Sequence, residues 1–142
     1  MRDDLKKAKS LLEEGGYTCV AVKGERVYTA TERGVAPLLN FLDSGISLED
    51  FAVADKVVGR AAAYLYCLLK IDTLYARVIS TSACEVLAEH GIAVTYDEMA
   101  SEIRNRSNTG RCPMEECVAD IQTAEEALPA IREKRRQLLA GK

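Results

Sequence analysis

The segment from Val57 to Leu69 constrains the fold of this 142-residue chain more than any other feature. It reads VVGRAAAYLYCLL, and its apolar residues fall on nearly every face of a helix, so that helix has to be buried on most sides. It is shorter than the ~20 residues that a bilayer requires, and Gly59 and Arg60 interrupt it, which argues against a membrane span. A buried helix of this kind usually lies against a sheet, which favours a layered α/β domain over a simple helical bundle.

The start of this helix carries the first candidate residues. Asp55 precedes the apolar run and is a residue type that helix N-caps prefer, so we expect the helix to begin there, with Phe51 to Ala54 leading into it. A plain N-cap and a ligand contact explain Asp55 equally well. Lys56 and Arg60 follow, and each is compatible with two interpretations, contact with a ligand or exposure at a solvated edge.

Periodicity and turn residues predict the remaining elements. Before the central helix we expect, in order, a helix over 3–14, a β-hairpin of strands 17–22 and 26–29, and a short helix over 35–42. After it we expect strands over 73–79 and 92–96, joined by a helix that Ser80, Thr81 and Ser82 cap. Strands alternating with helices predict parallel pairing of these later strands.

Three further helices are expected towards the C-terminus. They cover 97–103, 115–121 and a terminal segment that starts with a capping box of Thr123 and Glu126, in which Pro129 kinks or restarts the helix. The basic run of this last segment is interleaved with Glu133 and leucines, which is typical of a solvated helix face. Its cations are Arg132, Lys134, Arg135 and Arg136.

Composition narrows the class of protein. With 142 residues and 48% hydrophobic content, the chain forms one domain over 1–142. A net charge of −3 and a pI near 5.3 argue against nonspecific nucleic-acid binding. Five cysteines without CxxC spacing, and an N-terminus without a signal pattern, predict a reducing, cytoplasmic location. Neither nucleic acid nor membrane is expected as a partner.

The stretch RNRSNTGRCPMEECV, residues 104–118, is the richest in polar donors. Arg106, Thr109 and Gly110 are candidate ligand contacts, because guanidinium and hydroxyl groups bind anions and glycine lets the backbone approach closely. Cys112 is expected at the N-cap of the following helix, with Pro113 at its first position. A thiol at a helix N-terminus has a lowered pKa, which makes Cys112 a candidate nucleophile.

Several strings resemble one prokaryotic family of unknown function, domain number eighteen ninety-three, placed in the cytidine deaminase-like fold group. They are YTCVAVKGERVYTA, ERGVAPLL, FAVADKVVGRAAA and NRSNTGRCPME. The resemblance covers nearly the whole chain. It implies a three-layer α/β domain whose mixed sheet carries an N-terminal β-hairpin and helices on both faces, and it implies no particular reaction.

The fold analogy also predicts where a site lies. Zinc deaminases carry a His or Cys ligand and a Glu at one helix start and a PCxxC pair at the next, and this chain lacks both sets, so zinc is not expected. In the analogous fold, the starts of the two central helices face a common cleft. By that analogy the cleft is lined by Asp55, Lys56, Gly59, Arg60, Ser80, Thr81 and Ser82.

Three functional hypotheses remain open at this stage. The leading one is a cleft that binds a nucleotide or nucleoside-like ligand, with Asp55 as a candidate catalytic residue if there is a reaction. The second is a thiol-dependent enzyme or redox sensor that uses Cys112. The third is a noncatalytic module that forms a homo-oligomer through the terminal helix and the apolar side chains Leu38, Leu39, Phe41 and Leu42.

Overall fold

A five-stranded mixed sheet forms the centre of the computed structural model, which describes residues 3–32, 34–103 and 112–140. The sheet order is β2-β1-β3-β4-β5. β1 pairs antiparallel with β2 and β3, whereas β3, β4 and β5 are parallel, which confirms the predicted hairpin and parallel pairing. The strands are β1 (Cys19–Lys23), β2 (Arg26–Ala30), β3 (Ala52–Val58), β4 (Thr73–Ser80) and β5 (Ala93–Ala100).

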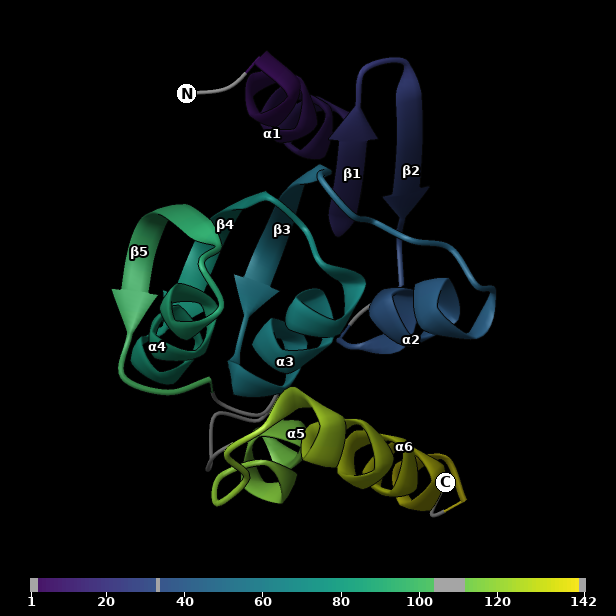
Figure 1. Ribbon diagram of the computed structural model, residues 1–142, viewed down its shortest axis with the longest axis vertical. Coiled ribbons are helices and arrows are strands. Elements are labelled where there is room, and N and C mark those ends of the chain that lie inside the picture. The colour runs from purple at the N-terminus through teal and green to yellow at the C-terminus, as the bar shows by residue number, and fades with distance from the viewer. Residues whose placement is uncertain (1–2, 33, 104–111, 141–142) are drawn as a thin grey trace.

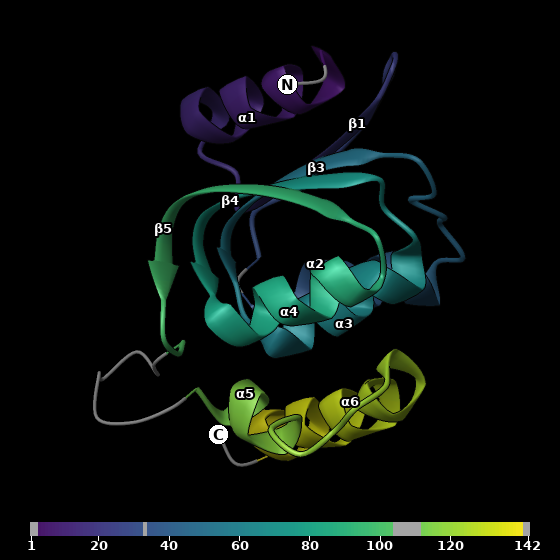
Figure 2. The same ribbon diagram turned by 60° about the vertical axis from the view of Figure 1, so that its left-hand side comes forward.

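Helices cover both faces of the sheet (Figures 1 and 2). α1 lies on one face, α2, α3 and α4 lie on the other, and α5 and α6 form an outer layer beyond α3 (Figure 2). The predicted layers are confirmed, and this outer pair adds to them. The helices are α1 (Asp3–Gly15), α2 (Ala36–Asp43), α3 (Arg60–Leu69), α4 (Thr81–Glu89), α5 (Pro113–Cys117) and α6 (Ala124–Ala140). None of the helices in the described ranges is long and apolar enough to cross a membrane.

Two hydrophobic clusters hold the layers together. Successive residues of β1 point to opposite faces of the sheet, so Val20 and Val22 pack towards α1 while Cys19 and Ala21 pack towards α3. A strand buried on both faces reads as a continuous apolar run rather than as an alternation. The central helix is buried as predicted, because every residue of α3 from Ala61 to Tyr66 is buried.

The predicted start of that helix is wrong. Asp55 lies inside β3, where it pairs with Cys19 of β1 and Ala76 of β4, and the N-cap of α3 is Gly59. A short apolar run such as Ala52–Val58 does not distinguish a buried strand from a helix. Pairing with β1 on one side and β4 on the other shows that this segment is a strand, so Asp55 is not a helix cap.

Other boundaries also shift. The helix predicted over 97–103 is absent up to Ala100, because β5 continues its pairing with β4 as far as Ser80↔Ala100. α5 ends at Cys117 rather than at 121. The capping box is confirmed, with Glu126 N–H donating to Thr123 Oγ1 at 3.2 Å. α6 runs on through Pro129, so the proline does not divide the helix.

The apolar side chains expected at an oligomer interface belong to the core of a single chain. Leu38, Leu39 and Phe41 are 1%, 3% and 8% exposed, and Leu42 packs partly buried against the same cluster. These side chains face α3 and the sheet because α2 closes the larger core. This set is therefore not a free surface.

Candidate functional site

Three hollows lie side by side at the edge where β3, β4 and β5 end and α3 and α4 begin. In parallel sheets, ligands bind outside the carboxyl ends of the strands, which makes this edge the natural place for a site. The hollow beside Asp55 and the middle hollow share Gly34 and Val57. The middle hollow and the one beside Arg60 share Ile103 and Glu115. The predicted cleft thus exists as a row of three compartments.

The first compartment, the Asp55 cavity, has a volume of ≈ 320 Å³. It lies between the strand pair β1 and β3 and the chain that enters α2. Its described lining consists of Thr18, Cys19, Gly34, Pro37, Asp55, Lys56 and Val57. Both Asp55 and Lys56 from the predicted set are here, although on a strand rather than at a helix start.

Asp55 is a buried carboxyl held by neutral donors. Its exposed fraction is 8%. The Tyr66 hydroxyl of α3 donates to Asp55 Oδ2 at 2.5 Å, and the Val57 N–H donates to Oδ1 at 3.3 Å. Burial raises the pKa of this carboxyl to about 6, although the hydrogen bonds from Tyr66 and from backbone amides act in the opposite direction. Asp55 is thus placed to titrate close to neutrality.

Tyr66 and Cys19 extend this group into the core. Cys19 Sγ lies 3.3 Å from Tyr66 Oη, and since the tyrosine hydrogen is given to Asp55, the thiol is the donor in that contact. Burial, and then the neighbouring Asp55, raise the pKa of both the Cys19 thiol and the Tyr66 hydroxyl. Both groups therefore stay neutral. No sequence signal pointed to Tyr66, because a tyrosine in an apolar helix is typical of a core residue.

The third compartment, the Arg60 hollow, is smaller at ≈ 160 Å³. It contains three members of the predicted set, Arg60, Ser80 and Ser82. Thr81 donates to Ala100 O at 3.3 Å and lies outside the lining of this hollow. The described lining is Arg60, Ser80, Ser82, Ser101, Glu102, Ile103, Glu115 and Ala119.

The Arg60 side chain joins three elements. Its Nε donates to Val118 O at 3.2 Å and one terminal nitrogen donates to Ile121 O at 2.6 Å, both in the chain between α5 and α6. The other terminal nitrogen donates to Ser82 Oγ at 2.8 Å at the start of α4. The guanidinium also lies 5.1 Å over the ring of Tyr64, whose hydroxyl donates to the same Ile121 carbonyl. Arg60 is therefore a tertiary clamp as well as a wall of the hollow.

Glu115 of α5 caps α3 from outside. Its Oε1 accepts from the Arg60 N–H at 2.6 Å and its Oε2 accepts from the Ala61 N–H at 3.1 Å. A side chain at Gly59 would collide with this carboxylate, because a Cβ there would lie 2.3 Å from Oε1. Glu115, which lies in the first turn of α5, thus serves the N-terminus of another helix as well.

The middle compartment, the Cys112 hollow of ≈ 290 Å³, connects the other two. Gly59 lines it, and so does Cys112, which is the N-cap of α5 as predicted. All five cysteines are free thiols, including Cys112 and Cys117. The predicted contacts Arg106, Thr109 and Gly110 lie outside the described residues.

The donor set at this edge does not fit zinc. α3 begins with Gly59 and Arg60 where a deaminase-type metal ligand is expected, and the start of α4 offers serine hydroxyls. In the described ranges, no group of three or more His, Cys, Asp or Glu side chains could hold a metal ion.

Comparison with known families decides the membership of the chain. A family model described as Domain of unknown function (DUF1893) matches residues 7–135. The chain belongs to the DUF1893 family. The resemblance recognised in its sequence strings is thereby confirmed, whereas no curated protein matches the chain at a significant level.

A solved structure of another family member agrees with the fold of this DUF1893 protein. The crystal structure of a DUF1893 family protein from Thermotoga maritima is similar with a TM-score of 0.88 and 27% sequence identity, over 94% of this chain and 91% of that one. A dCMP deaminase from cyanophage S-TIM5, in its apo form, is weakly similar, with a TM-score of 0.44 and 14% identity over 70% of this chain and 100% of that one.

Proposed function

We propose that this DUF1893 protein binds a nucleotide or nucleoside-like small molecule along the three hollows. The observation that carries the proposal is the buried Asp55 carboxyl on the wall of the largest compartment. Titratable groups with perturbed pKa values in a cleft are typical of functional sites. The cavity volume of ≈ 320 Å³ lies at the lower end of the range for small-molecule sites.

The two ends of the row suit different parts of such a ligand. A planar heterocycle with N–H donors suits the Asp55 cavity, where Cys19, Pro37 and Val57 supply apolar walls around a hydrogen-bond acceptor. We place the anionic end in the Arg60 hollow, because the guanidinium and the Ser82 hydroxyl lie at the N-terminus of α4, although Glu102 and Glu115 also line this hollow. Lys56 also lines the first compartment.

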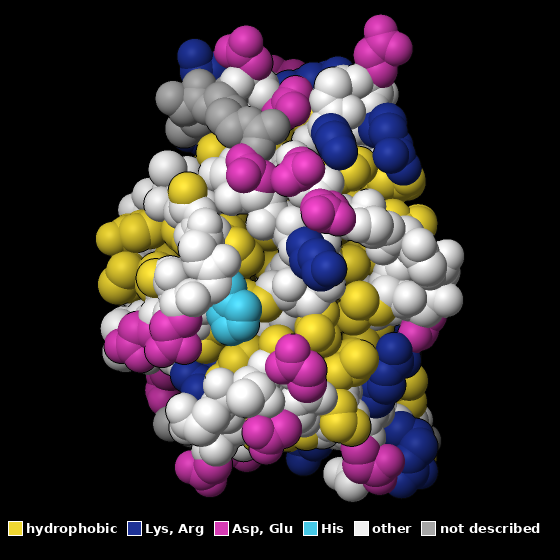
Figure 3. Space-filling view, in the orientation of Figure 1, with side chains coloured by type: hydrophobic (Ala, Val, Ile, Leu, Met, Phe, Trp, Pro, Cys, Tyr) yellow, Lys and Arg dark blue, Asp and Glu magenta, His cyan; other side chains and the backbone are white. Residues whose placement is uncertain are grey.

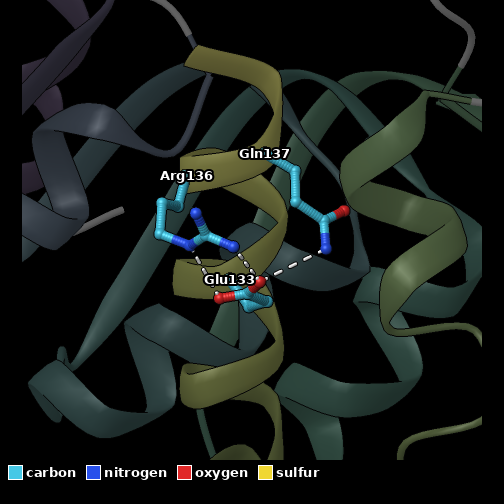
Figure 4. Close-up of polar contacts among 3 residues, drawn as sticks. All are labelled: Glu133, Arg136 and Gln137. Carbon is cyan, nitrogen blue, oxygen red and sulfur yellow. Dashed lines mark hydrogen bonds and ion pairs between the residues drawn. The ribbon is translucent and has the colours of Figure 1, made fainter. Parts of the chain in front are cut away.

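The distribution of charge favours a small molecule over nucleic acid. Figure 3 shows acidic and basic side chains interspersed on one face rather than gathered into a basic stripe. On α6, Glu133 accepts hydrogen bonds from both Arg136 and Gln137 (Figure 4), and Arg132 pairs with Asp43 at 2.7 Å. We also propose a cytoplasmic location, which the free thiols support.

Calorimetry with a panel of nucleosides and nucleoside monophosphates tests this function. We expect binding to the wild type and at least about tenfold weaker binding to Asp55→Asn, because the amide lacks the charge and replaces one of the two acceptor oxygens with an N–H donor. Asp97→Asn is the matched control, since Asp97 also accepts a tyrosine hydroxyl at 2.5 Å, from Tyr75, and lies outside the three linings. No heat with any member of the panel would remove the proposal.

A thiol-dependent reaction is the second candidate, because Cys112 lines the middle compartment. Reaction with a thiol reagent separates the two functions. If Cys112 is activated, Cys112→Ser removes a phase that is faster than a free model thiol at neutral pH. A rate no faster than that of the model thiol excludes this candidate and leaves the ligand-binding proposal untouched.

A further inference from the structure

We propose that Asp55 exchanges a proton with an amidine-type nitrogen of the ligand, that is, a ring nitrogen next to an amino group. The inference deepens the proposed function, on which it rests for the location of the ligand. It adds a chemical class for the group that enters the Asp55 cavity, and it gives Asp55 a role that goes beyond binding.

Hydrogen bonding leaves the carboxyl with capacity for a ligand. An ionised carboxylate offers about four lone-pair sites. The Tyr66 hydroxyl occupies one site on Oδ2, and the Val57 N–H approaches Oδ1 at the longer distance of 3.3 Å. The Lys56 N–H contributes least among these donors to the lowering of the Asp55 pKa. Since Asp55 lines the cavity, the remaining sites are available to a donor placed there.

The charges around Asp55 determine which ligand group matches it. From β1 it is faced by the Cys19 thiol and from α3 by the Tyr66 hydroxyl, and both groups are neutral. On β3 the neighbouring Lys56 also lines the cavity, and the chain leading into α2 contributes Gly34 and Pro37, which carry no charge. A buried carboxylate with neutral partners gains most from a ligand that brings one positive charge and N–H donors.

An amidine-type group supplies the positive charge and the N–H donors after one proton transfer. The Asp55 carboxylic acid gives its proton to the ring nitrogen, and the pair becomes a carboxylate and a cation joined by two N–H···O hydrogen bonds. One O–H bond breaks and one N–H bond forms, so atoms and charge balance without any co-reactant. The same complex forms when a ligand that is already protonated meets the ionised carboxylate.

This equivalence predicts a bell-shaped dependence of affinity on pH. The complex contains one proton for two titratable groups, so binding is strongest between the pKa of Asp55 and that of the free ligand. Below this window one proton must leave, and above it one must be taken up. Burial places the pKa of Asp55 at about 6, so a ligand with a pKa just above that gives the highest affinity near neutral pH.

The probe is 2-aminopyridine, a single ring that carries the amidine edge and no phosphate. Its affinity is measured by calorimetry across pH 5 to 8, with aniline, which lacks the ring nitrogen, as the control ligand. We expect 2-aminopyridine to bind the wild type with a bell-shaped profile and at least about tenfold more tightly than it binds Asp55→Asn. Aniline should not distinguish the two proteins, and Asp97→Asn should behave as the wild type.

Tyr66→Phe tests the role of Tyr66 in positioning Asp55. The measured quantity is the pH dependence of affinity for 2-aminopyridine, which a loss of stability alone does not shift. The Tyr66 hydrogen bond lowers the pKa of Asp55, so its removal should raise that pKa and shift the acid limb of the profile to higher pH. Equal affinity for 2-aminopyridine and aniline, a flat profile, or no binding of 2-aminopyridine overturns the inference. Nucleotide binding without proton exchange would refute this inference alone, and fragment binding without any nucleotide binding would refute the proposed function alone.

Discussion

The Arg60 junction, where Arg60 and Glu115 join α3 to α4, to α5 and to the chain after α5, lies at the same edge of the sheet as the Asp55 cavity. The charged groups of the two regions have different partners. At the junction, Arg60 reaches two carbonyls and a serine hydroxyl of other elements, and Glu115 caps the start of α3. These bonds attach the outer layer of α5 and α6 to the rest of the protein (Figure 1). In the cavity, the Asp55 charge meets only neutral donors among the contacts described above.

The difference separates a structural use of charge from a functional one. A charged donor with several well-placed acceptors contributes to stability, and its loss leaves each of those acceptors with one hydrogen bond fewer. A buried carboxyl whose pKa is raised costs stability at neutral pH, and proteins retain such groups most often at functional sites. We therefore expect substitutions at Arg60 to damage the fold and substitutions at Asp55 to damage ligand binding.

The largest expected effect is that of Arg60→Ala. It should reduce the free energy of unfolding by about 3 kcal/mol, because it removes three hydrogen bonds from a charged donor. The Ile121 carbonyl then keeps only the Tyr64 hydroxyl, and the Val118 carbonyl keeps only the Ile121 N–H. Urea denaturation measures the loss. Arg136→Ala is the control, since Arg136 is exposed and pairs with Glu133 on its own helix. Equal losses from the two variants would contradict the structural role of Arg60.

The next effect is the pH dependence of stability. In the folded state the pKa of Asp55 is raised by burial to about 6 from an ordinary value of 3.8, so between these values the folded protein binds more protons than the unfolded one. The contribution of Asp55 to stability is therefore present below pH 3.8 and is lost as the pH rises through 6. The shift corresponds to about 2–3 kcal/mol.

Asp55→Asn should remove this pH dependence. Its free energy of unfolding at pH 7 should equal or exceed that of the wild type, while Asp97→Asn keeps the wild-type slope. Denaturation at a series of pH values from 4 to 7 gives the comparison. A wild-type stability that rises over this range, and that Asp55→Asn leaves unchanged in slope, would contradict the assignment.

A smaller effect is expected from Gly59→Ala. The added Cβ would push the Glu115 carboxylate off the N–H groups of Arg60 and Ala61, at a cost of about 1 kcal/mol, typical of a lost helix cap. The φ of −100° at Gly59 suits alanine, so backbone strain does not contribute. Combined with Glu115→Ala, the substitution should cost little more than Glu115→Ala alone. Fully additive losses would show that the two residues act separately.

The smallest effect concerns the thiols of the folded protein. Burial raises the pKa of the Cys19 thiol, and burial raises that of Cys67 to about 12, so neither should react with a maleimide at pH 7 until the protein unfolds. Mass spectrometry of the labelled native protein gives the sites. Rapid labelling of Cys19 would show that the Cys19–Tyr66–Asp55 group is open to solvent, against its 2% exposure.

Local signals account for the parts of the fold that the sequence predicted. The β-hairpin, the cap at Ser80, the capping box of Thr123 and Glu126, and the N-cap at Cys112 all depend on residues within a few positions of one another. β3 was missed because Ala52–Val58 lacks a clear alternation of apolar and polar residues, and because Asp55 before an apolar run is typical of a helix N-cap. Only its pairing with β1 and β4 distinguishes it.

The sequence predicts that the candidate residues lie in one cleft at the starts of two helices. Asp55, Lys56, Gly59, Arg60, Ser80 and Ser82 do gather at one edge, but in three compartments rather than one. The partners of Arg60 at Val118 and Ile121 lie 58 and 61 positions away in the sequence, so no local pattern predicts them. The same holds for Tyr66, whose hydroxyl turns towards Asp55 only once α3 packs on β3.

The most direct test of the difference between the two regions is the titration of the Asp55 carboxyl itself. Carbon-13 NMR of the side-chain carboxyl, assigned by comparison with Asp55→Asn, gives its pKa in the folded protein without any ligand. The account predicts a midpoint near 6, with the Asp55 signal well separated from those of exposed aspartates. A midpoint at or below 3.8 would mean that the cavity holds an ordinary ionised carboxylate, and the contrast between the two regions would fail.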